Sequence, residues 1–315
     1  MSGFEMILPY LRPIEHLIGD QEVSEIMVNG DGRVFAERVG LIELVPEVSI
    51  PERQRQAAVR NIARILDDDI SEEKPLLDSR LPDGSRVAAV LGPTSVGGTI
   101  LCIRKFRSKL FTAEEMVRMG SLSVSVLRHL RQAIEARHTI LISGGTGTGK
   151  TTLLNALAAF LPQGERVVLI EDTAEISIGI PNLVRLEARR AQPDIPAVTI
   201  RDLLRQTLRL RPDRIILGEV RGAEAFDLLQ ALNTGHTGTL STIHANTARL
   251  AISRLRTCVA MAGVEVPDKA IAPNIAEVVQ VLVHIERING VRRVAEVLGM
   301  GRYDSVSDEY DLAQM

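Results

Sequence analysis

The chain has 315 residues, enough for two domains, and its 45% hydrophobic and 24% charged residues are typical of a globular protein with a buried core. The formal net charge of −3 argues against nucleic-acid binding by bulk electrostatics, because phosphate contacts need a net basic face. The two cysteines, Cys102 and Cys258, lack partners for a metal site or a disulfide framework. No apolar run approaches the ~20 residues that cross a bilayer, and the N-terminus lacks a signal-peptide pattern. We therefore expect a cytoplasmic protein.

Residues 1–107 predict a small α+β domain built mainly from short strands. Turn signals rich in Gly, Pro, Asp and Ser separate the apolar segments of this region. The predicted elements are strands at 25–29, 34–38, 86–91 and 99–106, with a helix at 51–66.

A polar stretch at 108–123 changes the character of the chain and predicts a linker. From 124 to 315, strands alternate with Ala- and Leu-rich helices, a pattern that indicates a parallel sheet covered by helices. The predicted strands lie at 139–143, 167–171, 215–218 and 239–243, with helices at 124–136, 150–161, 200–210 and 223–234. Near the end, Asn289-Gly290 between two apolar segments predicts a hairpin.

A phosphate-binding loop is predicted between the strand at 139–143 and the helix at 150–161. The sequence there matches G-x-x-x-x-G-K-[ST] in full. Glycines let backbone N–H groups turn toward a phosphate, and the helix that follows adds its positive N-terminal end. The predicted phosphate-binding residues are Gly144, Gly145, Thr146, Gly147, Thr148, Gly149, Lys150, Thr151 and Thr152.

Within this loop, Lys150 can reach the β- and γ-phosphates, and the Thr151 hydroxyl can bind Mg²⁺. We therefore predict ATP and Mg²⁺ as cofactors. A dinucleotide-binding fingerprint is disfavoured because its third glycine would fall at Lys150. The protein-kinase motifs His-Arg-Asp and Asp-Phe-Gly are missing.

Carboxylates follow two of the predicted strands, where ligands bind in open parallel sheets. Three acids, Glu171, Asp172 and Glu175, lie within 171–175, and Glu219 ends a strand that resembles a Walker B segment. Hydrolysis needs one carboxylate for Mg²⁺ and one to orient or deprotonate water. Glu219 is a candidate for both tasks, as a metal ligand partly through water. The alternative is that these acids are solvated loop residues or helix caps.

Two histidines, His236 and His244, bracket the strand at 239–243. Their spacing along a strand, with no Cys or acid beside them, is poor metal-ligand geometry. We interpret the pair as polar contacts that report the nucleotide state, with a structural role as the alternative.

These motifs, in this order, resemble those of the secretion and traffic ATPases of type IV secretion, type II secretion and type IV pilus machines. The matching segments are the loop at 144–151, an Asp box at 170–176, a Walker B segment at 211–222 and a His box at 234–246. The chain looks most similar to the conjugal-transfer (TrbB-type) branch. Two cysteines cannot form the four-Cys zinc module of larger relatives, which favours the compact type IV branch.

The resemblance implies a PAS-like N-terminal domain, a linker and a RecA-like P-loop NTPase core. It implies a homo-hexameric ring in which Mg²⁺-dependent ATP hydrolysis drives interdomain motion. Glu175 and Glu219 would be the acidic catalytic pair, and His244 falls in the His box. Arg86 and Arg104 are the candidates for N-terminal arginines that reach the phosphates of an ATP held between the domains.

The implied partners are inner-membrane components of a secretion or mating-pair-formation apparatus, with no sequence-specific nucleic acid and no transmembrane segment. A cytoplasmic location includes peripheral association with the inner face of the inner membrane as an alternative. A RecA-like hexameric helicase or DNA-translocating motor is the main rival function, although 3% aromatic residues leave few stacking platforms for single strands. A small GTPase and a non-hydrolysing ATP-binding protein are weaker alternatives, the former because Asn-Lys-x-Asp is missing.

Overall fold

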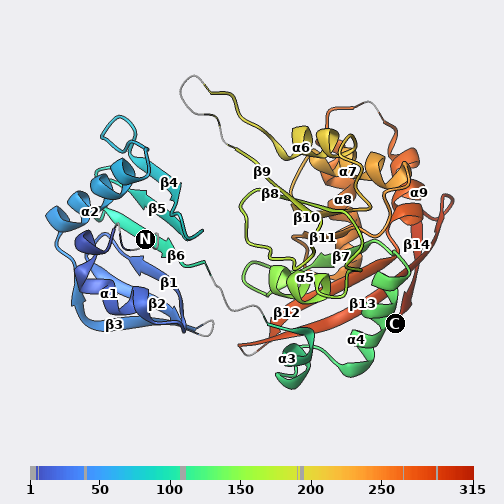
Figure 1. Ribbon diagram of the computed structural model, residues 1–315, viewed down its shortest axis with the longest axis horizontal. Coiled ribbons are helices and arrows are strands. Elements are labelled where there is room, and N and C mark those ends of the chain that lie inside the picture. Colours follow the sequence, from blue (N-terminus) through green and yellow to red (C-terminus); the bar gives the residue numbers. More distant parts are fainter. Residues whose placement is uncertain are drawn as a thin grey trace. The chain divides into compact units, whose positions relative to one another are not determined.

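A computed structural model describes residues 5, 7–38, 41–106, 111–189, 191, 195–264, 266–288 and 290–315 (Figure 1). The chain divides into two compact units, 1–109 and 110–315. Among the described residues, no helix is both long enough and apolar enough to span a membrane.

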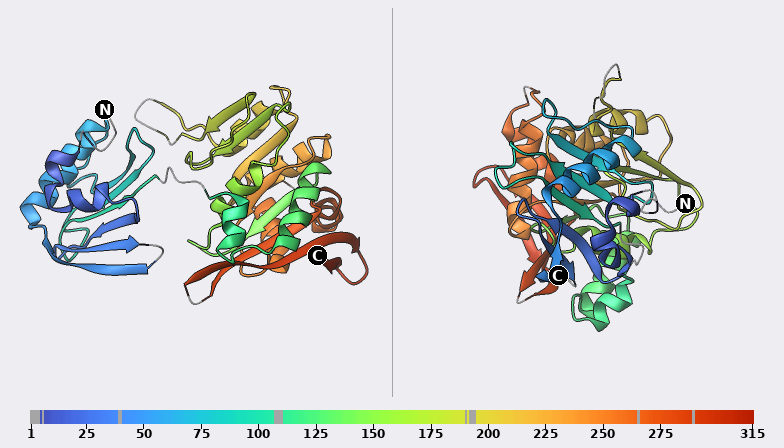
Figure 2. Two further views of the ribbon diagram at one scale, coloured as in Figure 1. Left: turned by 60° about the horizontal axis from the view of Figure 1, so that its bottom comes forward. Right: turned by 90° about the vertical axis from the view of Figure 1, so that its left-hand side faces the viewer.

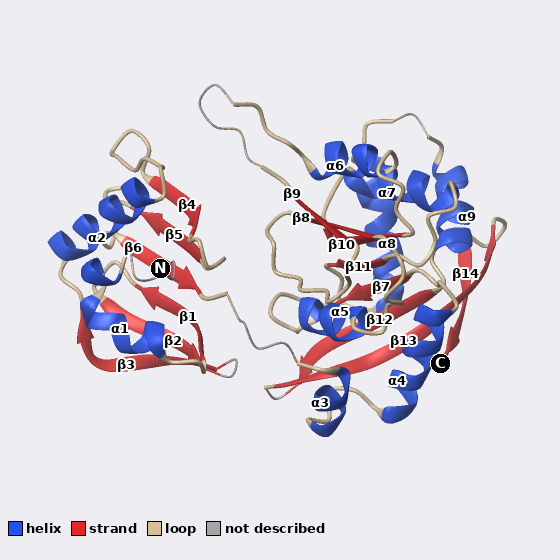
Figure 3. Cartoon of the chain, in the orientation of Figure 1, coloured by secondary structure: helices blue, strands red, loops and turns tan. Residues whose placement is uncertain are grey.

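Unit 1 is a six-stranded antiparallel sheet in the order β3-β2-β1-β6-β5-β4, with its helices on one side (Figure 3). The strands are β1 (Val23–Val28), β2 (Arg33–Arg38), β3 (Leu41–Ser49), β4 (Leu76–Arg80), β5 (Arg86–Val90) and β6 (Ile100–Arg104). The helical segments are η1 (Leu8–Tyr10), η2 (Arg12–Ile14), α1 (Glu15–Gly19) and α2 (Glu52–Ile65).

The core of unit 1 lies between α2 and one face of this sheet. Val59 and Ile62 of α2 pack into the same cluster as Ile26, Val87 and Ile103 from the central strands. Burial alternates along β5 and β6, as expected for a sheet with one covered face. The sequence missed β3 and β4 because neither segment, LIELVPEVS nor LLDSR, alternates regularly between apolar and polar residues.

Unit 2 contains an eight-stranded sheet in the order β14-β13-β12-β7-β11-β10-β8-β9. The strands are β7 (Ile140–Ser143), β8 (Val167–Glu171), β9 (Leu183–Glu187), β10 (Arg214–Val220), β11 (Leu240–Ile243), β12 (Val281–Ile288), β13 (Val291–Asp304) and β14 (Glu309–Gln314). The helices are α3 (Ala113–Arg118), α4 (Val124–Glu135), α5 (Lys150–Ala158), α6 (Ile200–Thr207), α7 (Glu224–Asn233), α8 (Ala248–Ala260) and α9 (Asp268–Val278).

Helices cover both faces of the unit 2 sheet (Figure 2). Ile140 and Ile142 of β7 pack with α3, α4 and α5, whereas Leu141 packs with α6 to α9 on the opposite face. The strands from β12 through β9 run parallel, and β13 and β14 are added antiparallel. The predicted α/β class with a parallel-rich sheet is confirmed.

The segment predicted as a linker, 108–123, includes part of the core of unit 2. Thr112 and Glu115 form a capping box that starts α3, and Ala113, Met116 and Leu122 are buried in the core with α4 and α5. The linker prediction is therefore wrong for 113–122, because the polar residues there lie on the outer face of a short amphipathic helix. Residues 108–110, like Asn289 of the predicted hairpin turn, lie outside the described residues.

Candidate nucleotide-binding site

One edge of the unit 2 sheet gathers the predicted site. β7, β11, β10 and β8 are adjacent and parallel, so their carboxyl ends lie together. The loop at 144–149 follows β7 directly, and His244 follows β11. Glu219 lies near the end of β10 and Glu171 ends β8. Ligands of open parallel sheets bind at this edge.

The conformation of the loop depends on glycine. A Cβ atom at Gly144 would collide with the carbonyl oxygen of Ile285, and Gly147 and Gly149 have φ angles of +71° and +100°. A side chain at these three positions would clash or be strained. Gly149 is the N-cap of α5 and, within the described part of the chain, no side chain caps the first N–H groups of that helix. Such a helix start is suited to an anion.

Lys150 is buried inside the loop that it follows. Its side-chain Nζ donates to the carbonyl oxygens of Gly144 at 3.0 Å and Gly145 at 2.9 Å. The same atom lies 3.4 Å from Nδ1 of His244. Burial lowers the pKa of Lys150, and the negative charge of Glu219 opposes this effect. The ammonium group is thus held by two backbone carbonyl groups of the loop.

Glu219 has a charged or titratable group on each side. His244 Nε2 lies 2.7 Å from its Oε1, and Arg221 Nη2 lies 2.7 Å from its Oε2. Oε1 is buried and, among the described residues, receives no hydrogen bond, so the approach of His244 is close without being aligned. Burial lowers the pKa of His244, while Glu219 opposes the shift. Glu219 therefore presents one carboxylate oxygen that still has room to accept a hydrogen bond.

The three acids after β8 have different roles. Oε1 of Glu171 accepts the backbone N–H groups of Glu175 at 2.7 Å and Ile176 at 2.8 Å, so this buried carboxylate shapes the loop. Its Cγ also lies 3.3 Å from the position of a Cβ at Gly218, so a side chain there would require Glu171 to shift slightly. Burial raises the pKa of Glu171, and the two N–H bonds oppose this.

Asp172 and Glu175 act on Arg221. Asp172 Oδ2 accepts a 3.1 Å hydrogen bond from Arg221 Nη1. Burial alone would lower the pKa of Arg221, but the bond to Glu219 and the charges of Glu219, Asp172 and Glu175 leave it raised. Glu175 itself is half-buried. Of the acids singled out in the sequence, Glu219 is therefore the one that contacts His244, whose other ring nitrogen lies 3.4 Å from Lys150.

Other predicted residues fall into two groups. Thr148 closes the loop by donating to the Gly145 carbonyl at 3.0 Å, and Thr151 and Thr152 are half-buried in the first turn of α5. His236 instead places Nδ1 3.2 Å from the carbonyl oxygen of Ala231 near the end of α7. The two histidines thus contact different groups, His236 at a helix end and His244 beside Glu219, and the interpretation that both report the nucleotide state stays a prediction.

Arg86 and Arg104 belong to unit 1, where they face each other directly across β5 and β6. Arg104 is exposed, and Arg86 lies 3.5 Å from Asp78. Like charges placed opposite each other destabilise a sheet.

Two residues near the loop were not predicted. Arg292 Nε donates to the Gly147 carbonyl at 3.1 Å, and His284 Nδ1 lies 2.9 Å from the Ser143 hydroxyl. Both come from the β12–β13 hairpin, more than a hundred residues away in the sequence. No local pattern in the sequence marks such contacts, because they depend on which strand lies beside β7.

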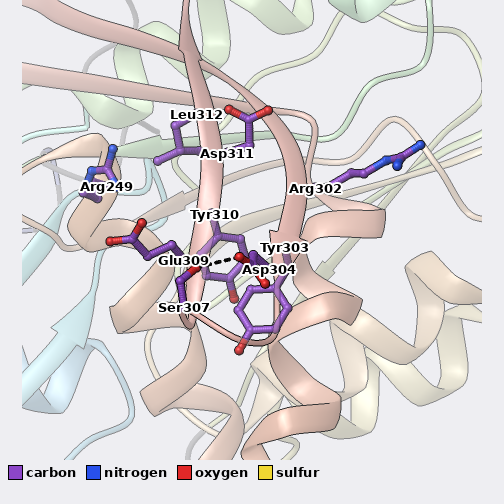
Figure 4. Close-up of a pocket in the computed structure, with 9 residues that line it drawn as sticks. All are labelled: Arg249, Arg302, Tyr303, Asp304, Ser307, Glu309, Tyr310, Asp311 and Leu312. Atoms are coloured by element: carbon purple, nitrogen blue, oxygen red, sulfur yellow. Dashed lines mark hydrogen bonds between the residues drawn. The ribbon is translucent and has the colours of Figure 1, made fainter.

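A hollow on unit 2 lies at the β13–β14 hairpin (Figure 4). Two of its polar side chains are hydrogen-bonded within the hairpin: Ser307 Oγ donates to Asp304 at 2.9 Å, and the Tyr303 hydroxyl donates to the neighbouring Asp308 at 2.6 Å. None of the predicted site residues lines it. We assign it no ligand.

The chain belongs to the family described as Type II/IV secretion system protein, whose model matches residues 10–296. The predicted resemblance to type IV secretion ATPases, and to their conjugal-transfer branch, is confirmed. A probable conjugal transfer protein TrbB of Sinorhizobium fredii is 36% identical over 315 residues, covering 95% of this chain and 94% of that protein.

Solved structures agree with this family. The VirB11 ATPase from the Brucella suis type IV secretion system, crystallised in complex with sulphate, is 30% identical with a TM-score of 0.51 and 94% coverage of both chains. The pilus retraction motor PilT with bound ADP is 19% identical with a TM-score of 0.59, covering 96% of this chain and 82% of that one, and supports the fold alone.

Proposed function

We propose that this chain is the ATPase motor of a type IV secretion or conjugative transfer system. The observation that carries the proposal is the meeting of Lys150, His244 and Glu219 at the mouth of a glycine-dependent loop. Nζ of Lys150 lies 3.4 Å from His244, whose other nitrogen lies 2.7 Å from Glu219. A cation for phosphate and a carboxylate for water thus lie on either side of His244, and nucleoside triphosphate hydrolysis requires both kinds of group.

ATP would bind through the backbone of 144–149, the start of α5 and Lys150. In the nucleotide-bound state, Lys150 exchanges the carbonyl oxygens of Gly144 and Gly145 for phosphate oxygens. The ammonium is a point charge on a flexible stem, so this exchange needs no movement of the backbone. The sulphate complex of the related VirB11 ATPase supports an anion site in this family.

The site also fits Mg²⁺, which binds through few protein oxygens together with waters and phosphates. Among the described residues, no group of three or more His, Cys, Asp or Glu forms a dedicated metal cage. Thr151 and the buried Oε1 of Glu219, which has no hydrogen-bond donor there, are the oxygens that would hold the ion, partly through water. Mg²⁺ would neutralise charge that develops on the phosphate oxygens.

Glu219 is the carboxylate that would orient or deprotonate the attacking water. Arg221 donates to its Oε2, His244 Nε2 lies 2.7 Å from its Oε1, and Glu175 is the second acid of the pair. His244, which touches both Glu219 and Lys150, is placed to sense whether the phosphate is present. Transfer of the Lys150 ammonium from the loop carbonyl groups to a phosphate oxygen would change the charge that lies next to His244.

We extend the proposal to the assembly on the basis of the family. The chain would act in the cytoplasm as a homo-hexameric ring, with a PAS-like unit 1 and a RecA-like unit 2, and interdomain motion would deliver work to inner-membrane components. Arg86 and Arg104 would contact the nucleotide phosphates. Their direct opposition across β5 and β6 supports this role, because an anion between them would relieve their repulsion.

Phosphate release by the full chain, with ATP and Mg²⁺, tests the proposal. Lys150→Ala should abolish turnover, and Glu219→Gln should retain ATP binding while slowing hydrolysis about a hundredfold or more. Lys269→Ala, at an exposed lysine of α9, is the matched control and should behave as wild type. Normal turnover by Lys150→Ala or Glu219→Gln would contradict the site assignment. Strong stimulation of turnover by single-stranded DNA would favour a helicase or DNA-translocating motor instead.

A further inference from the structure

The β12–β13 hairpin is the predicted element that the proposed function has not yet used. β12 pairs in parallel with β7, the strand that leads into the phosphate loop, and β13 pairs with β12. In this register, Ile285 lies opposite Val294, and Arg287 lies opposite Arg292. Ile285 and Val294 belong to the core beneath α5. Arg287 and Arg292 form the next pair on the same face, closer to the turn of the hairpin.

The start of the loop packs directly on β12. His284 Nδ1 lies 2.9 Å from the hydroxyl of Ser143, the residue before the loop, and both side chains are buried. The carbonyl oxygen of Ile285 occupies the space that a side chain on Gly144 would need. The loop therefore begins from a fixed position.

Arg292 holds the middle of the same loop. Its Nε donates to the carbonyl oxygen of Gly147 at 3.1 Å. Its aliphatic part also packs against the next glycine, since a Cβ at Gly149 would lie 3.2 Å from Arg292 Cδ. The half-buried arginine thus contacts the loop on both sides of Thr148.

The hydrogen bond from Arg292 to the Gly147 carbonyl also orients the N–H group of the next residue, Thr148. A trans peptide unit is planar, so its C=O and the N–H of the next residue point in opposite directions. With its oxygen held by Arg292, the Gly147–Thr148 peptide directs the Thr148 N–H away from the hairpin. Gly147 has a φ of +71° and no side chain that restricts its backbone, so the hydrogen bond from Arg292 is a direct restraint on this peptide from the Gly147 side.

We infer that Arg292 is a positioning residue for nucleotide binding, one that holds the Thr148 N–H toward the phosphate. The inference rests on the proposed function, because it gives the loop a phosphate to bind. The proposed role of Arg292 depends on its hydrogen bond to Gly147, and not on its positive charge alone. Arg287, opposite Arg292, brings a second guanidinium to the same face, but the described contact to the loop is made by Arg292.

Binding of ADP with Mg²⁺ to the full chain, measured by calorimetry, tests the inference. Arg292→Met keeps the aliphatic stem and removes the donor, so we expect affinity to fall about tenfold, the worth of one hydrogen bond from a charged group. Arg292→Lys restores a donor and should recover most of the loss. Arg293→Met, at an exposed position on the opposite face of β13, and Arg287→Met are the matched controls and should bind within about twofold of wild type.

Thermal unfolding without nucleotide shows whether Arg292→Met folds, and Arg292→Leu, which also lacks a donor, carries the same test if it does not. Wild-type affinity in the folded Arg292→Met protein would overturn the inference alone. An equal loss of ADP affinity in Arg287→Met would also overturn the inference, because the effect would then come from positive charge near the loop and not from the hydrogen bond. Failure of the wild-type chain to bind ADP would overturn the proposed function and the inference with it.

Discussion

The two sheets of the molecule differ in how many of their faces are covered. In unit 1, burial alternates along β6, and α2 covers one face only. In unit 2, every residue of β7 and β8 is buried, because helices cover both faces. A half-covered sheet can carry charged groups anywhere on its open face, as Arg86 and Arg104 show. A fully covered sheet has room for function only at the ends of its strands, which is where Lys150, Glu219 and His244 lie.

Core truncations should give the largest effect and sharpen this comparison. In β7, Leu141→Ala and Ile142→Ala face opposite cores, so each should lower the free energy of unfolding by about 2–5 kcal/mol. In β6, Ile103→Ala should cost a similar amount, whereas its exposed neighbour Arg104→Ala should change the free energy of unfolding by less than about 0.5 kcal/mol. Urea denaturation measures the free energy of unfolding of each variant. A neutral Leu141→Ala would contradict the description of β7 as buried on both faces.

The open face of unit 1 should matter for turnover and little for stability. Arg104→Ala and Arg86→Ala should each lower kcat/KM for ATP about tenfold, the effect expected when one charged contact to phosphate is lost. Arg64→Ala, at an exposed position of α2, is the matched control on the covered side of the sheet. Steady-state kinetics of the full chain would decide, and unchanged kcat/KM in both variants would remove these arginines from the site.

The smallest effect should come from a histidine buried in the covered sheet. Burial lowers the pKa of His284, and Glu286 and Glu296 oppose the shift. The folded state therefore binds fewer protons than the unfolded state, and stability should fall as the pH drops below the usual histidine pKa of about 6.5. His284→Gln should flatten that part of the stability–pH curve measured by thermal unfolding. An unchanged slope between about pH 7 and 5 would show that His284 does not contribute.

Local patterns were sufficient where one element carries the signal. The loop at 144–151 was found because strand, glycines, lysine and helix follow one another in the sequence, and Glu219 because it ends an apolar strand. Strands β3 and β4 were missed, since their residues do not alternate regularly between apolar and polar types. The helix within the predicted linker was missed because it has only six residues, of which two, Ala113 and Met116, are buried.

The sequence alone therefore determined the α/β class, the phosphate loop and the acids and histidine that follow neighbouring strands. Only the tertiary structure decided which of them meet. It placed His244 between Lys150 and Glu219, assigned His236 to a helix end, and brought Arg292 to the loop from a hairpin far along the chain. The physical reason is that local backbone preferences depend on residues nearby in the sequence, whereas contacts between side chains depend on the order of strands in the sheet.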